Sequence, residues 1–186
     1  MAKAVVLLAA GFEEIEATTV IDVLRRCNVK VVVAGLSSEL ITGAHDMRVA
    51  PDTSIDKVKA EDYDAIICPG GNPGYINLRK NPVVLSLVRQ AFNSGKLVAA
   101  ICAAPAVLAD AGILNGKKCT IYPGMEEELE RGGGKVQRNL VVEDGNVITS
   151  QGPATALHFA FKVAERLAGK AVVEEVKERM LANLIL

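Results

Sequence analysis

A single cysteine stands where an apolar strand pattern gives way to a helical one. Residues 97–101 form an apolar run typical of a buried parallel strand, and after Cys102 the apolar residues recur at helical spacing. Pro105 falls in the first helical turn, where its missing N–H is tolerated. A thiol at a helix start feels the positive end of the helix dipole, which favours the thiolate. Cys102 is therefore a candidate nucleophile, or else a small buried apolar residue, as free cysteines often are.

Carboxyl groups gather after the first predicted strand, at residues 4–10. Gly11 and Phe12 make the turn, and Glu13, Glu14 and Glu16 open a helix. Acidic residues in a first turn usually complement the helix dipole with solvated heads. Alternatively, one of them points across the strand ends, where parallel α/β sheets bind their ligands. Periodicity alone does not choose among the three.

A glycine-rich loop follows another buried strand, predicted at residues 63–68. The loop reads Pro69-Gly70-Gly71-Asn72-Pro73-Gly74. Such a loop brings backbone N–H groups close to a ligand. It matches neither the phosphate-loop spacing nor GxGxxG, and a plain tight turn is the alternative. Its interest comes from lying at the same predicted sheet edge as Cys102.

The elements that position these residues alternate between strands and helices. This order predicts a single domain over residues 1–186, with a doubly wound, mostly parallel sheet and helices on both faces. Residues 36–59 break the pattern and predict a small β-hairpin excursion with a short helical turn. Further strands are expected at residues 29–35 and 118–122 and as a β-pair at 136–142 and 146–150; helices are expected after Glu13, Asn81, Cys102 and Pro153 and at residues 125–131 and 171–186.

The loops carrying the three features should meet at one edge of the sheet, in the crevice where the strand order reverses. A thiolate, a nearby carboxyl and backbone N–H donors are the parts needed to attack an electrophilic carbon. The same parts tune a thiol for oxidation to a sulfenic or sulfinic acid.

Composition excludes several classes of function. The chain has 186 residues and a formal net charge of −1, which argues against a general nucleic-acid binder. No apolar run is long enough to span a bilayer, and no signal peptide precedes the first strand. The four cysteines form no CxxC pair, and His45 and His158 are the only histidines, so neither a metal site nor a cofactor is expected. We expect reduced thiols, a cytoplasmic location and a surface position for His158.

Four motifs together resemble the DJ-1/ThiJ/PfpI superfamily, and within it the DJ-1/YajL-like branch. The resemblance covers nearly the whole chain and implies a flavodoxin-like fold and a homodimer. The motifs are Gly11-Phe-Glu-Glu-Ile-Glu16, Cys68-Pro-Gly-Gly71, Ala99-Ala-Ile-Cys-Ala-Ala-Pro105 and Thr149-Ser-Gln-Gly-Pro-Ala-Thr155.

The resemblance also implies roles for individual residues. Cys102 takes the place of the nucleophilic, oxidation-prone cysteine, and Glu16 that of the carboxyl that hydrogen-bonds its sulfur. Because a carboxyl must be protonated to donate that bond, we expect a raised pKa at Glu16. The oxyanion and substrate-binding positions fall on Gly70, Gly71, Ala103 and Tyr122.

Three positions depart from the family pattern. Tyr122 stands where a histidine is common, and tyrosine is a poor general base at neutral pH. His45 stands where the branch often has an arginine that reaches the partner subunit's site. Ala103 replaces the histidine that follows the cysteine in protease-type relatives, which disfavours a cysteine protease or a small-molecule hydrolase.

Two functions therefore remain. In the first, Cys102 adds to a 2-oxoaldehyde such as methylglyoxal or glyoxal, and Glu16 moves a proton between the adjacent carbons, with no glutathione. The same chemistry on early glycation adducts would be deglycase activity. In the second, Cys102 is the oxidisable residue of a redox sensor or redox-linked chaperone. We favour the first, because an aldehyde trap needs only a thiolate, a carboxyl and donors.

Overall fold

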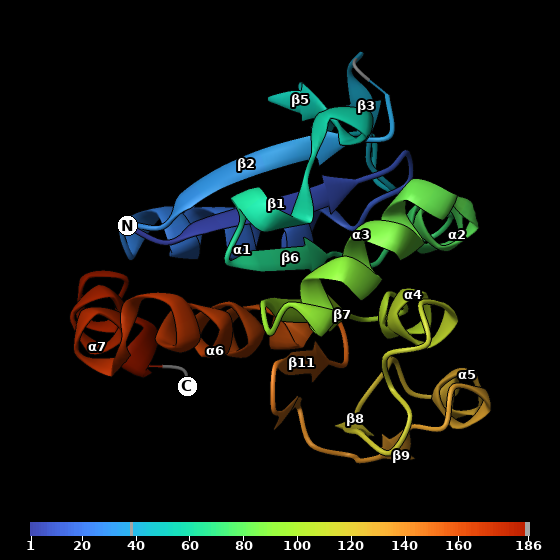
Figure 1. Cartoon of the computed structure of the whole chain (residues 1–186). Helices are drawn as coiled ribbons and strands as arrows, with labels where there is room; N and C mark the ends of the chain where they lie inside the picture. The colour runs from blue at the N-terminus through green and yellow to red at the C-terminus, as the bar shows by residue number, and fades with distance from the viewer. Residues whose placement is uncertain (38, 185–186) are drawn as a thin grey trace.

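The computed structural model describes residues 1–37 and 39–184. Its centre is a seven-stranded sheet in the order β10-β11-β7-β6-β1-β2-β5, visible in Figure 1 as strands lying side by side. Every neighbouring pair is parallel except β10 and β11. The strands are β1 (Lys3–Leu8), β2 (Lys30–Gly35), β5 (Thr53–Ser54), β6 (Ala65–Cys68), β7 (Leu97–Ile101), β10 (Val141–Asp144) and β11 (Val147–Ser150).

Helices cover both faces of this sheet, so its central strands β1, β6 and β7 are apolar apart from Lys3 at the start of β1. Alternate residues of β1 point to opposite faces: Val5 and Leu7 belong to one core cluster, and Val6 and Leu8 to the other. The first cluster lies under α3 (Pro82–Asn93) and α4 (Pro105–Asp110), and the second under α1 (Glu14–Arg26), α6 (Ala156–Ala168) and α7 (Lys170–Arg179). The predicted α/β class and mostly parallel sheet are confirmed.

The order of the strands creates the crevice that the sequence predicts. After β1, the chain adds β2 on one side and then returns to place β6 on the other, so the loops after β1 and β6 diverge at a switch point. β6 pairs with β7 so that Cys68 lies beside Ala100. Continuing that register brings Gly70 level with Cys102.

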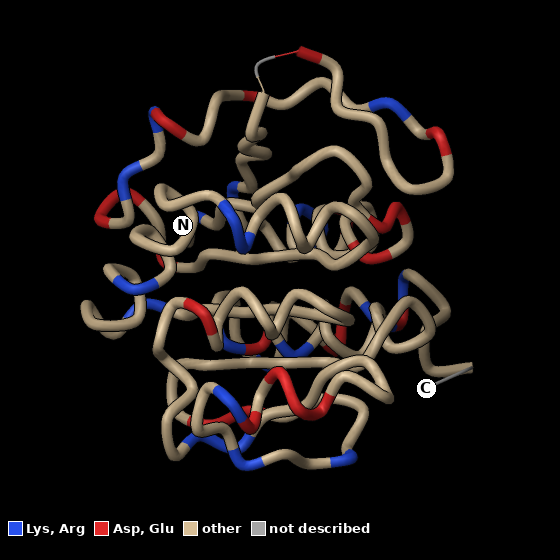
Figure 2. The backbone as a smooth tube through the Cα atoms, turned by 90° about the vertical axis from the view of Figure 1, so that its right-hand side faces the viewer, with Lys and Arg blue, Asp and Glu red and all other residues tan. Residues whose placement is uncertain are grey.

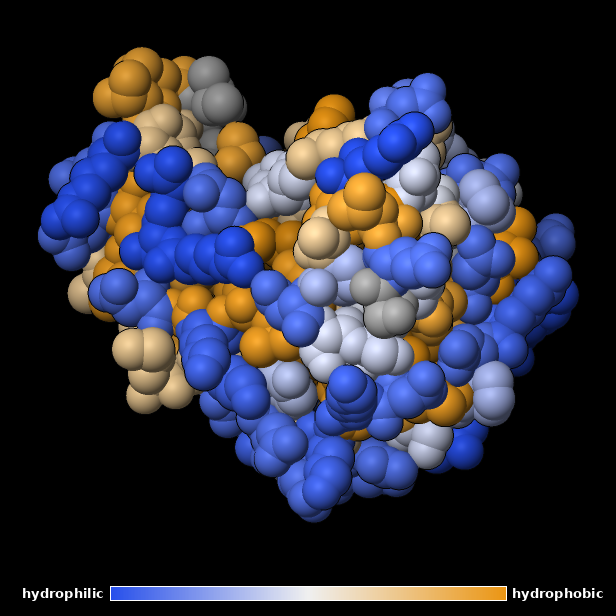
Figure 3. All heavy atoms as spheres, turned by 90° about the horizontal axis from the view of Figure 1, so that it is seen from above, coloured by the Kyte–Doolittle hydropathy of each residue, from blue (hydrophilic) through white to orange (hydrophobic). Residues whose placement is uncertain are grey.

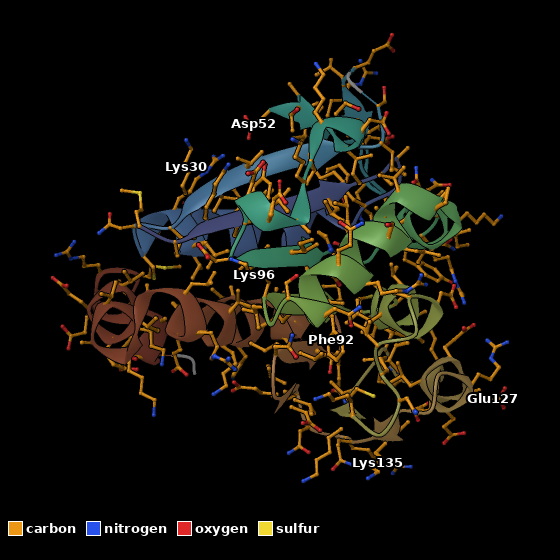
Figure 4. The ribbon with its side chains drawn as sticks, in the orientation of Figure 1. Lys30, Asp52, Phe92, Lys96, Glu127 and Lys135 are labelled. Carbon is orange, nitrogen blue, oxygen red and sulfur yellow. The ribbon has the colours of Figure 1, made fainter. Side chains whose placement is uncertain are left out.

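Two small β-pairs lie outside the main sheet. The hairpin expected within residues 36–59 is present as β3 (Ile41–Thr42) and β4 (Arg48–Val49), followed by the short helices η1 (Ile55–Lys57) and η2 (Ala60–Asp62). The second pair joins β8 (Lys118–Cys119) in parallel to β9 (Lys135–Val136). Between them, α5 (Glu126–Arg131) is the predicted short surface helix, and Glu127 and Lys135 mark this outlying part of the chain in Figure 4.

The prediction of a strand over residues 118–122 is wrong beyond Cys119. The following backbone is used elsewhere: the Thr120 N–H donates to Thr149 Oγ1 at 2.9 Å, and the Tyr122 N–H donates to the Cys102 carbonyl at 2.9 Å. These bonds connect residues 120–122 to β11 and to the turn after β7, so the pairing of β8 with β9 does not extend past Cys119.

Three further details differ from the sequence-based prediction. A helix that the prediction lacks, α2 (Gly74–Lys80), follows the glycine-rich loop. His158 is half-buried rather than on the surface, and its Nδ1 is buried without a hydrogen-bond partner among the described residues. The last helix ends at Arg179, with a short η4 (Ala182–Leu184) after it, and residues 185–186 of the expected apolar tail lie outside the described residues.

Charged residues of both signs are spread along the described chain. Blue and red segments are interspersed along the tube in Figure 2, in keeping with the net charge of −1. Hydrophobic surface is scattered among hydrophilic residues on the face in Figure 3. Among the described residues, no helix combines the length and apolarity needed to cross a bilayer.

Candidate active site

Cys102 occupies a strained elbow between β7 and α4. Its φ is +64°, a left-handed conformation that non-glycine residues adopt rarely and that is often found at functional sites. The turn is held from both sides, because its N–H donates to the Ser150 carbonyl at 3.0 Å and its carbonyl accepts from the Tyr122 N–H. Cys102 is half-buried, whereas Cys27, Cys68 and Cys119 are buried. The elbow thus presents one thiol of the four to a pocket.

The buried carboxyl beside this thiol is Glu16, on the first turn of α1. Its Oε2 accepts a hydrogen bond of 2.8 Å from the Gly70 N–H. Its Oε1 is buried without a nitrogen or oxygen partner in the described chain, and the carboxyl is in hydrogen-bond contact with the Cys102 sulfur. Burial raises the pKa of Glu16 to about 7, although the bonds from Gly70 and Cys102 oppose the rise. The raised pKa agrees with the expectation from the sequence.

The thiol itself does not behave as the helix-dipole argument predicts. Burial, the charge of Glu16 and the hydrogen bond with Glu16 raise the pKa of Cys102 to about 12, and the N–H groups of Ala103 and Gly71 only partly offset this rise. α4 is six residues long and begins three positions after the thiol, so its dipole is a weak opposing influence. Protonating Glu16 removes its negative charge, and the titrations of the two groups are therefore coupled.

The glycine-rich loop supplies one backbone N–H to Glu16 and another to the Cys102 sulfur. Gly70 gives its N–H to Glu16, and a Cβ on Gly70 would lie 2.6 Å from Cβ of Cys102 and 2.9 Å from Oε2 of Glu16. Gly71, at a φ of +92°, directs its N–H to the Cys102 sulfur, as Ala103 does. Because the Gly70 N–H is already used, Gly70 positions Glu16. Of the predicted oxyanion and substrate-binding positions, Gly71 and Ala103 are the two whose N–H groups face the sulfur.

His45, in the loop between β3 and β4, lies against the outer side of the first turn of α1. Its Nδ1 is 3.0 Å from Glu14 Oε2 and 3.6 Å from Glu13 Oε2, and its side chain is 72% exposed. The ligand atoms of these three residues lie within 4.8 Å of one another, the one such group in the described chain, but a histidine–carboxylate ion pair accounts for the arrangement. Its predicted reach into a partner subunit's site stays a prediction.

The Cys102 thiol opens into a pocket of about 410 Å³. Tyr122 lines it, as predicted, although its backbone rather than its side chain bonds the Cys102 turn. The pocket is also lined by Glu13, one of the three candidate carboxyls, and by four residues to which the sequence-based prediction gave no role: Asn72, Tyr75, Met125 and Pro153. Glu13 and Pro153 lie within the motifs quoted above, whereas Tyr75 belongs to the unpredicted α2 and Met125 precedes α5.

The fold and this site define the class of protein. The model of the DJ-1/PfpI family matches residues 2–166, and the chain belongs to that family.

Particular relatives extend the match over almost the full length. Protein dj-1beta of Drosophila melanogaster is 45% identical over 180 residues, which is 96% of each chain. The crystal structure of Drosophila melanogaster DJ-1beta has a TM-score of 0.91 at 44% identity and covers 97% of both chains. A Caenorhabditis elegans relative named glutathione-independent glyoxalase DJR-1.2 is 40% identical over 157 residues, 84% of this chain and 83% of that protein.

Proposed function

We propose that this protein is a glutathione-independent glyoxalase that converts 2-oxoaldehydes, such as methylglyoxal and glyoxal, to 2-hydroxy acids. The observation that supports it best is the half-buried Cys102 thiol in contact with a buried carboxyl whose pKa is about 7. A group that titrates near neutral pH can both take and return a proton. The named activity of the Caenorhabditis elegans relative supports the same reaction class.

The first step joins the sulfur to the aldehyde carbon. Glu16, as the carboxylate, takes the thiol proton while the sulfur attacks, so a free thiolate need not accumulate despite the high pKa of Cys102. The aldehyde oxygen gains negative charge, which the N–H groups of Gly71 and Ala103 are placed to stabilise, and then receives the proton from Glu16. The product is a hemithioacetal.

The second step moves hydrogen between the two carbons. Glu16 removes the proton from the former aldehyde carbon and returns it to the neighbouring carbonyl carbon. The hydroxyl proton of the former aldehyde carbon moves to the oxygen of its neighbour, which becomes the alcohol. The former aldehyde carbon is oxidised to a thioester while its neighbour is reduced, so no external oxidant is needed. One water then hydrolyses the thioester, and the 2-hydroxy acid and the Cys102 thiol are released. In an early glycation adduct, a hemiaminal, the Cys102 sulfur would replace the amine, which leaves as the free amine with the thiol proton. The same hemithioacetal results, and the activity is that of a deglycase.

The test is lactate formation from methylglyoxal without glutathione. We expect Cys102→Ala to reduce turnover to background and Glu16→Ala to reduce it by about 10²-fold or more. Cys27→Ala is the matched control, because Cys27 is a buried cysteine at the end of α1, away from the pocket. Wild-type turnover that survives in Cys102→Ala would contradict the mechanism.

A second candidate, an oxidative-stress sensor or redox-linked chaperone, is favoured by one observation. Cys102 is the least buried of the four cysteines, and its sulfur already receives two N–H donors that would hold an oxidised product. A structural neighbour is described as oxidised Toxoplasma gondii DJ-1, at 34% identity and a TM-score of 0.91. Mass mapping after limited peroxide should find Cys102 modified first; earlier modification of Cys27 or Cys119 would contradict this candidate.

A further inference from the structure

The pocket over Cys102 is larger and more apolar than the smallest 2-oxoaldehydes require. Its volume of about 410 Å³ falls in the range typical of pockets for small organic ligands. Two aromatic rings, Tyr75 and Tyr122, line it together with Met125 and Pro153. Glyoxal has no side chain to contact these groups, so most of this apolar surface would stay unused with that substrate.

Tyr122 is the lining aromatic residue whose backbone is bonded to the Cys102 turn. Its backbone N–H is bonded to the Cys102 carbonyl, which ties its position to the nucleophile. Its ring lies against Gly152, since a Cβ built there would be 3.4 Å from Tyr122 Cδ2. Yet the residue is 47% exposed, so one side of the ring remains open to a ligand. The ring is thus an aromatic wall of the pocket that the Cys102 thiol opens into.

The charges around the pocket select against anions. The residues that line it include no lysine, arginine or histidine, and the one ionisable carboxyl among them is Glu13. Glu16 lies beneath the sulfur and adds a second acidic group. A substituent carrying a carboxylate or phosphate would find no cation among the lining residues to pair with, because the nearby His45 ring is already engaged by Glu13 and Glu14.

We propose that Tyr122, with Tyr75 and Met125, forms a specificity pocket for 2-oxoaldehydes whose carbonyl bears a neutral aromatic or bulky apolar group. This inference rests on the proposed function, because it names the substrate class of the same site. Aromatic groups in offset or edge contact gain attraction beyond simple burial. Phenylglyoxal is the matching probe, with its aldehyde at Cys102 and its phenyl ring against Tyr122.

The first experiment compares kcat/KM for phenylglyoxal, 4-carboxyphenylglyoxal and glyoxal from initial rates. Each value is divided by the equilibrium constant for adduct formation with a small free thiol, which removes intrinsic reactivity. We expect phenylglyoxal to be preferred over both competitors by about tenfold or more. Tyr122→Ala should lower the phenylglyoxal-to-glyoxal ratio by about tenfold, and Tyr122→Phe, which keeps the ring, should restore it. Leu181→Ala, an exposed apolar residue near the C-terminus, is the control and should not change the ratio.

A second measurement does not require turnover. The rates at which 2-bromoacetophenone and iodoacetamide alkylate Cys102 are followed by intact mass, with Cys102→Ala as the blank. The aromatic reagent should be favoured in the wild type, after correction for free-thiol reactivity, and less favoured in Tyr122→Ala. No turnover with retained aromatic preference would overturn the proposed function and leave the pocket assignment standing. Turnover without aromatic preference, or a ratio unchanged in Tyr122→Ala, would overturn the specificity pocket alone.

Discussion

Two carboxyls two residues apart on the first turn of α1 have opposite environments. Glu16 is fully buried against the Cys102 sulfur, and burial raises its pKa to about 7. Glu14 lies on the outer side, where burial opposes the change but hydrogen bonds from His45, its side chain first, and from the Met47 N–H lower its pKa. Two residues along a helix are about 200° apart, so the turn directs one carboxyl to the sheet edge and the other to the hairpin loop.

The difference lies in the number of donors that each carboxyl receives. Glu14 Oε1 accepts the His45 N–H at 2.7 Å and the Met47 N–H at 3.4 Å, and Oε2 contacts the His45 ring. Glu16 receives one backbone N–H, and its Oε1 has no nitrogen or oxygen partner in the described chain. A well-solvated or well-bonded carboxylate stabilises the fold, whereas a buried and under-bonded one is held ready for proton transfer at the expense of stability.

The largest expected effect is on activity. Glu16→Gln keeps an acceptor for the Gly70 N–H but cannot carry a proton, so kcat/KM for methylglyoxal should fall by roughly 10²–10⁴-fold. Glu14→Gln should change it by less than about threefold, because Glu14 does not line the pocket. Equal losses in the two variants would remove the distinction between the two carboxyls.

The next effect is the pH dependence of stability. Because the folded pKa of Glu16 lies above its ordinary value of 4.5, the folded state holds more protons between pH 4.5 and about 7, and stability falls as the pH rises through that window. The shift corresponds to roughly 3 kcal/mol, at about 1.4 kcal/mol per pKa unit. Urea unfolding should therefore show Glu16→Gln more stable than the wild type at pH 8 and little different at pH 4.5. A Gln variant less stable at pH 8 would contradict the raised pKa.

Removing the Glu14 carboxyl should change stability in the opposite direction, by destabilising the fold. Glu14→Ala leaves the N–H groups of His45 and Met47 without their acceptor and should lower the free energy of unfolding at pH 7 by about 1–3 kcal/mol. Its pKa is lowered, so this stabilisation is present above pH 4.5 and is lost as the pH falls below it. The exposed Glu127→Ala on α5 is the matched control and should be near neutral in the same urea titration.

The smallest expected effect is on the pKa of His45. The hydrogen bond with Glu14 and the charges of Glu13 and Glu14 raise its pKa above the ordinary 6.5. An NMR titration of the two imidazole rings, assigned with His158→Gln, should show that rise in the wild type and a smaller rise in Glu14→Gln, where the charge of Glu13 remains. A His45 pKa that does not respond to Glu14→Gln would show that the ion pair does not persist in solution.

Much of this arrangement follows from local sequence pattern. The apolar run before Cys102, the change to helical spacing after it and the glycines after Cys68 are short-range features, and each predicted its strand, turn or helix correctly. The hairpin within residues 36–59 and a second β-pair were also predicted, because turn residues separate alternating segments there. The first strand of that pair was predicted at residues 136–142 and lies at Val141–Asp144 instead.

Other features depend on contacts between segments far apart in the chain. Periodicity left Glu13, Glu14 and Glu16 equivalent, and only the resemblance to a family singled out Glu16. The strand over residues 118–122 stops early because Thr149 and Cys102 take its backbone hydrogen bonds. The helix α2 was missed because its residues follow a loop of glycines and prolines that reads as irregular.

The sequence by itself determined the order of the elements and the chemical groups at the ends of β1, β6 and β7, because these depend on spacing within a few residues. The tertiary structure decided how those groups behave. It buried Glu16 with a single backbone donor and set Cys102 beside it, so that the thiol gained a raised pKa instead of the lowered one that its position before a helix suggested. A pKa depends on burial and on neighbouring charge, and both are properties of segments brought together by folding.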